Sequence, residues 1–258
     1  KGVGFFLGAV LLQVAGFRGS MLLLAGLLAV TLLASTALLP RALGKMREKP
    51  RFRDVFSKSP SINRLAGARF FLFGARDVWF VVGLPVFLHA TLDWQFAEVG
   101  AFFAAWIIGY GIVQAIAPRL WHRGEPPGGR AALAFVASLT LIPFAIAAGL
   151  ESGFAPGPVV VLGLTAFGVV FAVNSSIHSF LVLAYSKHDR VSMDVGFYYM
   201  ANAGGRLTGT ILSGWTYQAY GLPGCLVASG LMLGAASLVS TLLPATHRPF
   251  DDTAAHTG

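Results

Sequence analysis

The chain has 258 residues, of which 55% are hydrophobic and only 12% are charged, and its mean hydropathy is +0.70. A soluble domain has about 25% charged residues, so this composition excludes an ordinary soluble protein. The single cysteine, Cys225, excludes an intrachain disulfide, a thiolate zinc cluster and a redox pair.

The chain begins inside an apolar run. Lys1 is not a methionine, and it leads directly into apolar residues without the layout of a signal peptide, so we expect the amino-terminal part of a longer protein to be missing. A second apolar run, Ser20 to Leu39, follows a turn at Gly16 to Gly19. Residues 1–40 are therefore predicted to hold two membrane helices, the first of them partial.

A basic segment at residues 41–64 separates these helices from the rest of the chain. It contains eight Lys and Arg residues together with Pro50 and Pro60, which predicts a loop with room for a short helix at the membrane surface. Six further apolar runs follow, each long enough to cross a hydrocarbon core of about 30 Å. They are Leu65 to Ala90, Phe96 to Leu120, Ala131 to Leu150, Val159 to Tyr185, Val195 to Ala219 and Leu222 to Leu243. The sequence thus predicts an all-α polytopic membrane protein, with six helices over residues 65–246 and a tail at 247–258.

The placement of Lys and Arg predicts the orientation in the membrane. Segments 41–64, 118–130 and 186–190 contain eight, three and two of these residues, whereas segments 89–98, 151–158 and 221–224 contain none. By the positive-inside rule, the basic segments and the tail are cytoplasmic. The net charge of +8 therefore indicates topology, and we do not expect nucleic acid as a partner.

The two helices before the basic loop resemble the last two helices of the chain. An offset of 205 positions pairs Gly4 with Gly209, Gln13 with Gln218, Gly16 with Gly221 and Gly19 with Gly224. Such a repeat is typical of two parallel six-helix halves related by an axis along the membrane normal. The same offset places Lys1 on Arg206.

The predicted helix from Leu65 to Ala90 contains three charged residues in its apolar run, Arg69, Arg76 and Asp77. Arg76 falls near mid-bilayer, where a cation costs about 2.5 kcal/mol or more. Arg69 and Arg76 are two helical turns apart and share a face, which predicts a basic stripe that faces an interior. For Asp77 two roles remain open: it neutralises Arg76 or Arg69, or it couples transport to protons.

Arg206 is a second cation near mid-bilayer. The neighbouring Gly205 and Gly209 have the spacing that permits close helix approach. Arg206 itself either forms a structural ion pair or carbonyl clamp, or binds an anionic substrate, because the planar guanidinium suits phosphate, arsenate or carboxylate. With Arg76 and Lys1 as further cations, the predicted substrate has more than one negative group.

Other polar residues in the apolar runs are candidates of lower rank. Pairs that share a helix face are Asn174 with His178, Tyr110 with Gln114, and Tyr198 with Asn202. The last two pairs either contact substrate or bond across helices, and His178 is either a packed histidine or a proton carrier. We find no Ser-His-Asp set and no spacing of metal ligands, so we expect neither an enzyme nor a metal or cofactor.

Three stretches resemble a known family: FFLFGARDVWFVVGLPVFL at Phe70 to Leu88, GYGIVQ at Gly109 to Gln114, and YYMANAGGR at Tyr198 to Arg206. With helices in two halves around a basic central loop, the chain resembles the major facilitator superfamily, and more narrowly its organoarsenical efflux permeases of the ArsJ type. The likeness spans nearly the whole chain and is most specific around Arg76 and Asp77.

This resemblance implies an exporter of 1-arseno-3-phosphoglycerate, the ester that forms when glyceraldehyde-3-phosphate dehydrogenase uses arsenate in place of phosphate. It implies a monomeric multi-pass protein of the bacterial cytoplasmic membrane that confers arsenate resistance beside that dehydrogenase. The expected substrate-binding residues are Arg76, Arg206, Lys1, Asn202, Tyr198 and Asn174, and the expected ion-pair or proton-coupling residues are Asp77, Arg69 and His178. A carrier for another organic anion, such as a sugar phosphate or a carboxylate, is the alternative.

Overall fold

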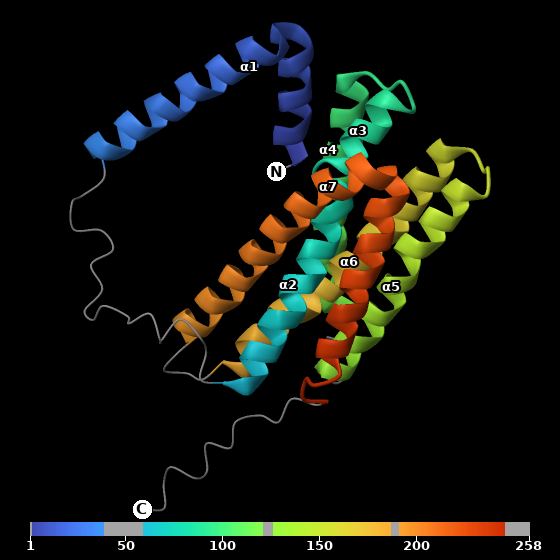
Figure 1. The fold of residues 1–258 in the computed structure, drawn as a ribbon. Coiled ribbons are helices and arrows are strands. Elements are labelled where there is room, and N and C mark those ends of the chain that lie inside the picture. Colours follow the sequence, from blue (N-terminus) through green and yellow to red (C-terminus); the bar gives the residue numbers. More distant parts are fainter. Residues whose placement is uncertain (1, 39–58, 121–125, 187–190, 246–258) are drawn as a thin grey trace, which may run out of the picture. The chain divides into compact units, whose positions relative to one another are not determined.

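The computed structural model describes residues 2–38, 59–120, 126–186 and 191–245 (Figure 1). Lys1, most of the basic loop and the tail lie outside these ranges. Within them every regular element is a helix: α1 (Gly2–Leu38), α2 (Pro60–Phe80), α3 (Gly83–Ala90), α4 (Phe96–Ile116), the short 3-10 helix η2 (Ala117–Leu120), α5 (Gly129–Glu151), α6 (Pro156–Tyr185) and α7 (Val191–Ser240).

Six of the described helical stretches are long and apolar enough to cross a membrane: Val3–Leu38, Pro60–Ala90, Phe96–Arg119, Gly129–Glu151, Pro156–Tyr185 and Val191–Ser240. The predicted all-α class with several membrane helices is therefore confirmed. From Pro60 onward there are six helical stretches: α2 with α3, α4, α5, α6 and the two limbs of α7. The apolar runs predict the same number.

Two glycines bend the longest helices. Gly16 divides α1 with φ 65° and ψ 177°, and Gly221 divides α7 with φ 64° and ψ −161°. Figure 1 shows that α1 and α7 each turn along their length. Because a positive φ is readily adopted only by glycine, each glycine is required for its turn. The offset of 205 pairs these two residues, so the sequence repeat recurs as a repeated backbone conformation.

The span predicted at Leu65 to Ala90 falls within one apolar helical stretch, Pro60–Ala90, and a two-residue turn interrupts its helix. α2 ends at Phe80 and α3 begins at Gly83. Pro85 has no amide hydrogen, and its ring clashes with the carbonyl of the residue four positions earlier in a continuous helix. At the interruption, the amides of Val82 and Gly83 donate to Oγ of Ser213 on α7, at 3.2 and 3.1 Å.

Contacts divide the chain into two compact units, and the division falls inside α4. The first unit comprises Lys1–Val55 and Asp93–Ile108, and its described packing includes the stacked rings of Phe5 and Phe103, 5.6 Å between centroids. The second unit, Phe56–Leu92 with Gly109–Gly258, contains every candidate site residue that the structure describes.

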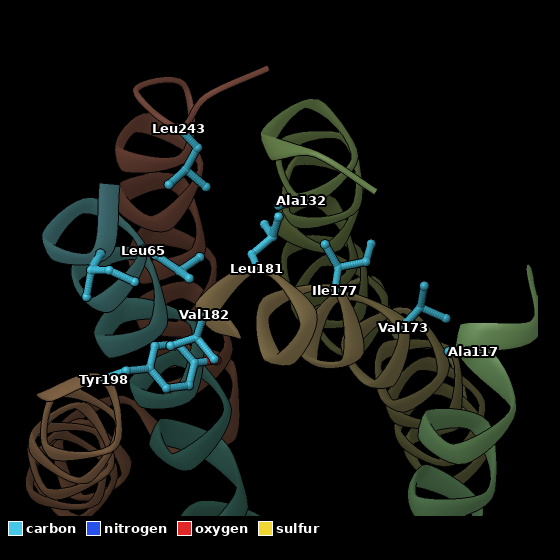
Figure 2. Packing of buried hydrophobic residues seen from close by; sticks show 10 residues of the cluster. Leu65, Ala117, Ala132, Val173, Ile177, Leu181, Val182, Tyr198 and Leu243 are labelled. Atoms are coloured by element: carbon cyan, nitrogen blue, oxygen red, sulfur yellow. The ribbon is translucent and has the colours of Figure 1, made fainter. Parts of the chain in front are cut away.

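A buried cluster of hydrophobic residues joins the helices of the second unit (Figure 2). Its members come from α2, η2, α5, α6, α7 and the turn after α7: Ile62, Leu65, Ala117, Ala132, Val173, Ile177, Leu181, Val182, Tyr198 and Leu243. Tyr198 belongs to this core, and its ring also lies 5.0 Å from the guanidinium carbon of the buried Arg69.

α2 and α7 cross in close contact. A Cβ atom on Gly205 would meet the carbonyl oxygen of Phe70, and one on Gly209 would meet the carbonyl oxygen of Gly74. The close approach that the glycine spacing predicts is therefore confirmed. The crossing brings the arginines of α2 beside the polar residues of α7.

Candidate functional site

Asp77 is shared by two arginines. Its Oδ1 accepts from Nε of Arg76 at 2.7 Å and lies 2.6 Å from Nη2 of the same residue. Its Oδ2 accepts from Nε of Arg206 at 2.8 Å. The Asp77 side chain is 1% exposed and that of Arg76 10%, whereas that of Arg206 is 48% exposed. We call these three residues the ion triad; it has two positive charges and one negative charge.

The ion triad shows which arginines Asp77 pairs with. Of the two arginines on its own helix, Asp77 pairs with Arg76, and its second partner is Arg206. The crossing helices bring Arg76 and Arg206 together although they are 130 positions apart in the numbering (206 − 76). Proton coupling by Asp77 and substrate binding by Arg206 stay predictions.

Arg69 is buried, 5% exposed, and its partners are neutral. Nε donates to Oδ1 of Asn202 at 3.1 Å, and Nη1 donates to Oγ of Ser175 at 3.1 Å and to the Ser175 carbonyl oxygen at 3.5 Å. Among the described residues no carboxylate forms an ion pair with Arg69. The possible ion pair of Arg69 is therefore not observed, and within the described part of the chain its charge has no counter-ion.

Three donors converge on the hydroxyl of Ser175. Besides Nη1 of Arg69, the Tyr110 hydroxyl lies 3.2 Å and Nε2 of Gln114 lies 3.4 Å from Ser175 Oγ. Ser175 is fully buried, whereas Tyr110 and Gln114 are half-buried. A hydroxyl oxygen has two lone pairs, so this arrangement supplies more donors than acceptors.

Aromatic rings lie against both arginines of α2. The guanidinium carbon of Arg69 lies 3.8 Å from the ring centroid of Phe73, and that of Arg76 lies 5.0 Å from the same centroid. The two guanidinium carbons are therefore separated by no more than 3.8 Å plus 5.0 Å. Tyr198 lies against Arg69 at 5.0 Å and Phe171 against Arg76 at 5.6 Å. The predicted basic stripe is confirmed as a pair of buried cations that share Phe73.

The remaining predicted site residues differ in their surroundings. Asn202 binds Arg69 directly, and the Tyr198 ring contacts it, so both belong to this region. Asn174 and His178 are buried on α6, and their polar side-chain atoms have no hydrogen-bond partner within the described ranges. Substrate binding by Asn174 and proton coupling by His178 stay predictions, as does substrate binding by Lys1, which lies outside the described residues.

The sequence offers Ser175 only as one of four polar candidates of lower rank on its helix, with Asn174, Ser176 and His178. It lies between Asn174 and Ser176 on a helix, and nothing in the residue order distinguishes these polar neighbours. The signal for its partners was present, because Tyr110 and Gln114 are four residues apart and share a helix face. Their predicted hydrogen bonding across helices is confirmed.

No family model, curated protein or solved structure matches this chain. What the site can bind is therefore inferred from its own charges and donors. Asp77 pairs with Arg76 and Arg206, and the buried Arg69 shares the Phe73 ring with Arg76, on helices long enough to cross a membrane. Such a region is chemically suited to an anion.

Proposed function

We propose that the protein is a multi-pass membrane carrier for an organic anion with more than one negative group. The observation that supports this proposal is the charge of the region: Arg69, Arg76 and Arg206 are balanced by Asp77 alone within the described chain. The region therefore has a net charge of +2, from three arginines and one carboxylate. A cation at the bilayer centre costs about 2.5–3.5 kcal/mol even on the lenient scales, so a bound anion would offset a large cost.

The spacing of the cations supports a substrate with two anionic ends. The ion triad retains one net positive charge and Arg69 has another, and the guanidinium groups of Arg76 and Arg69 both lie within 5.0 Å of the Phe73 ring. One anionic end would contact Arg69, and the other would contact the half-exposed Arg206. A single small anion would leave one of these charges unbalanced.

We further propose the major facilitator architecture with alternating access. The matched bends at Gly16 and Gly221 support two halves built from the same repeat. In this mechanism a cavity opens to the cytoplasm, the anion bridges the cations, and the halves rock to release it on the other side. The proposed location is the bacterial cytoplasmic membrane, with the basic segments inside.

The narrower proposal for the substrate is 1-arseno-3-phosphoglycerate. It rests on the resemblance of the stretches around Arg76, Tyr110 and Arg206 to organoarsenical efflux permeases. A phosphate at one end and an arsenate ester at the other match the two-ended charge requirement. A sugar phosphate or a dicarboxylate would satisfy the same cations, so a carrier for such an anion is the second candidate.

Uptake into everted membrane vesicles tests both levels of the proposal. The complete gene product is in the vesicle membrane. Glyceraldehyde-3-phosphate dehydrogenase, its substrate and arsenate are supplied outside, with NAD+ present throughout as the oxidant, and arsenic inside the vesicles is measured. We expect accumulation that requires all three reagents, is lost in Arg76→Gln and persists in Arg119→Gln, a matched change at an exposed arginine. No accumulation despite intact protein and ester formation would overturn the arsenic substrate. Failure with labelled sugar phosphates and dicarboxylates as well would overturn the anion carrier.

A further inference from the structure

We propose that Arg69 and its neighbours form a distinct subsite for a tetrahedral oxyanion of the phosphoryl type, an inference that rests on the proposed carrier function and assigns one end of its substrate. The subsite comprises Arg69, Ser175, Tyr110, Gln114 and Asn202. We call these five residues the Arg69 subsite.

Charge distinguishes the Arg69 subsite from the ion triad. Both oxygens of Asp77 already accept from Arg76 and Arg206, so an anion at the ion triad must compete with a carboxylate. Arg69 binds only neutral oxygens, and the part of the chain that the structure describes places no carboxylate on it. A buried cation without a counter-ion is strongly disfavoured, which makes this position the one where an anion gains most.

The hydrogen bonds of Arg69 also leave donors available. A guanidinium has five N–H groups, and the described partners are bonded only to Nε and Nη1. The two N–H groups of Nη2 therefore have no acceptor among the described residues. At Ser175 Oγ, three donors share an oxygen with two lone pairs. An anionic oxygen at this point would supply the acceptors that the protein lacks.

The shape of the donor set favours a tetrahedral group. The donors are Arg69 on α2 and Tyr110 and Gln114 on α4, and the acceptors that they reach in the structure are Ser175 Oγ on α6 and Asn202 Oδ1 on α7. Donors from separate helices suit the three terminal oxygens of a phosphoryl group, whereas a planar carboxylate is satisfied by one guanidinium fork. Arg69 and Ser175 are buried, and Tyr110, Gln114 and Asn202, which we call the rim, are half-buried.

The guanidinium of Arg69 is held in position before any ligand arrives. The Phe73 ring lies 3.8 Å from its central carbon, the Tyr198 ring lies 5.0 Å from it, and Asn202 fixes Nε. Cation–π contact and hydrogen bonding thus limit the rotation of the long side chain. Little conformational entropy is then lost on binding, which favours affinity at this subsite.

Thermal unfolding of the purified complete gene product in detergent tests the subsite. The probe is inorganic phosphate, compared with acetate at equal ionic strength, because a ligand that binds only the folded state raises its unfolding temperature. We expect phosphate to raise the temperature in a saturable way and acetate to have a much smaller effect. Tyr110→Phe removes one rim donor and should weaken the apparent affinity for phosphate by about tenfold.

Gln114→Glu is the decisive variant. The new carboxylate would supply the counter-ion that Arg69 lacks, so the protein should unfold at a higher temperature than wild type and lose its response to phosphate. Gln218→Glu, the same change at an exposed position on α7, should retain the response. Arg69→Lys keeps the charge but removes the fork, and we expect at least about a tenfold loss of apparent affinity if the variant folds.

Two unfolding results would each overturn the subsite: wild-type protein that phosphate stabilises no more than acetate, or a Gln114→Glu variant that responds to phosphate like wild type. Because binding in detergent does not require transport, the two proposals fail separately. Phosphate binding without anion uptake overturns the carrier function and leaves the subsite. Anion uptake that is unaffected by Gln114→Glu overturns the subsite and leaves the carrier.

Discussion

Arg206 on α7 donates from Nε to Oδ2 of Asp77 on α2, over 2.8 Å. This bond joins the half-exposed arginine to a carboxylate that is almost fully buried. The other carboxylate oxygen holds Arg76, so a single acidic residue determines how two cations are presented.

Replacing Asp77 by Asn should destabilise the protein. The change leaves Arg76 buried without its counter-ion, and breaking a buried pair in this way costs about 3–5 kcal/mol. Chemical denaturation in detergent measures the loss. Glu151→Gln, at an exposed acid near the end of α5, is the control and should stay within about 0.5 kcal/mol of wild type. Equal stability of Asp77→Asn and wild type would contradict the role of the carboxylate as the compensating charge.

Replacing Arg206 by Gln should separate function from stability. Asp77 keeps its bonds to Arg76 in this variant, and the Arg206 side chain is already 48% exposed, so membrane abundance should match wild type. Arsenate resistance of cells that express the complete gene should nevertheless be abolished. Resistance at the wild-type level, with abundance confirmed by immunoblot, would remove Arg206 from the proposed substrate contacts.

The crossing of α2 and α7 should tolerate no side chain at its glycines. Gly205→Ala and Gly209→Ala each place a methyl group against a carbonyl oxygen of α2, and we expect each to cost about 1–3 kcal/mol. Gly214→Ala is the matched control, because a Cβ there has no other atom within 4 Å. This control should be neutral or stabilising by up to about 1 kcal/mol, as Ala favours a helix over Gly. The same loss in all three variants would indicate helix propensity rather than close contact.

The bend in α7 should depend on glycine. At φ 64° an alanine at position 221 is strained, and Gly221→Ala should cost about 1–2 kcal/mol in thermal or chemical unfolding. Gly234→Ala lies in the same helix with open space around it and should lose nothing. If Gly221→Ala unfolds like Gly234→Ala, the bend does not require the left-handed conformation.

The predicted orientation can be tested with single cysteines. In a Cys225→Ala background, Phe154→Cys introduces a thiol at an exposed residue of the connection between α5 and α6, which we expect outside the cell. Arg119→Cys introduces one on the predicted cytoplasmic side. A membrane-impermeant maleimide should label the first in intact cells and the second only in everted vesicles. Reversed labelling would contradict the positive-inside assignment.

The sequence by itself determined which segments cross the membrane and where the long helices turn. Long apolar runs must satisfy their backbone hydrogen bonds internally, so they form helices, and glycines 16 and 221 permit turns that other residues resist. The sequence also required that Arg69, Arg76 and Arg206 face an interior, because a cation in hydrocarbon is costly. These conclusions follow from local composition and are independent of how the helices are arranged.

Only the tertiary structure decided which of these charges is compensated. On its own helix Asp77 could neutralise Arg69 or Arg76, and the structure pairs it with Arg76. The crossing at Gly205 and Gly209 brings Arg206 to its second oxygen. Ser175, 106 positions from Arg69, became its partner through the packing of a separate helix. Residue order fixes the faces of each helix, but the partners of a buried charge depend on which faces meet, since only groups within a few ångströms can share a hydrogen bond.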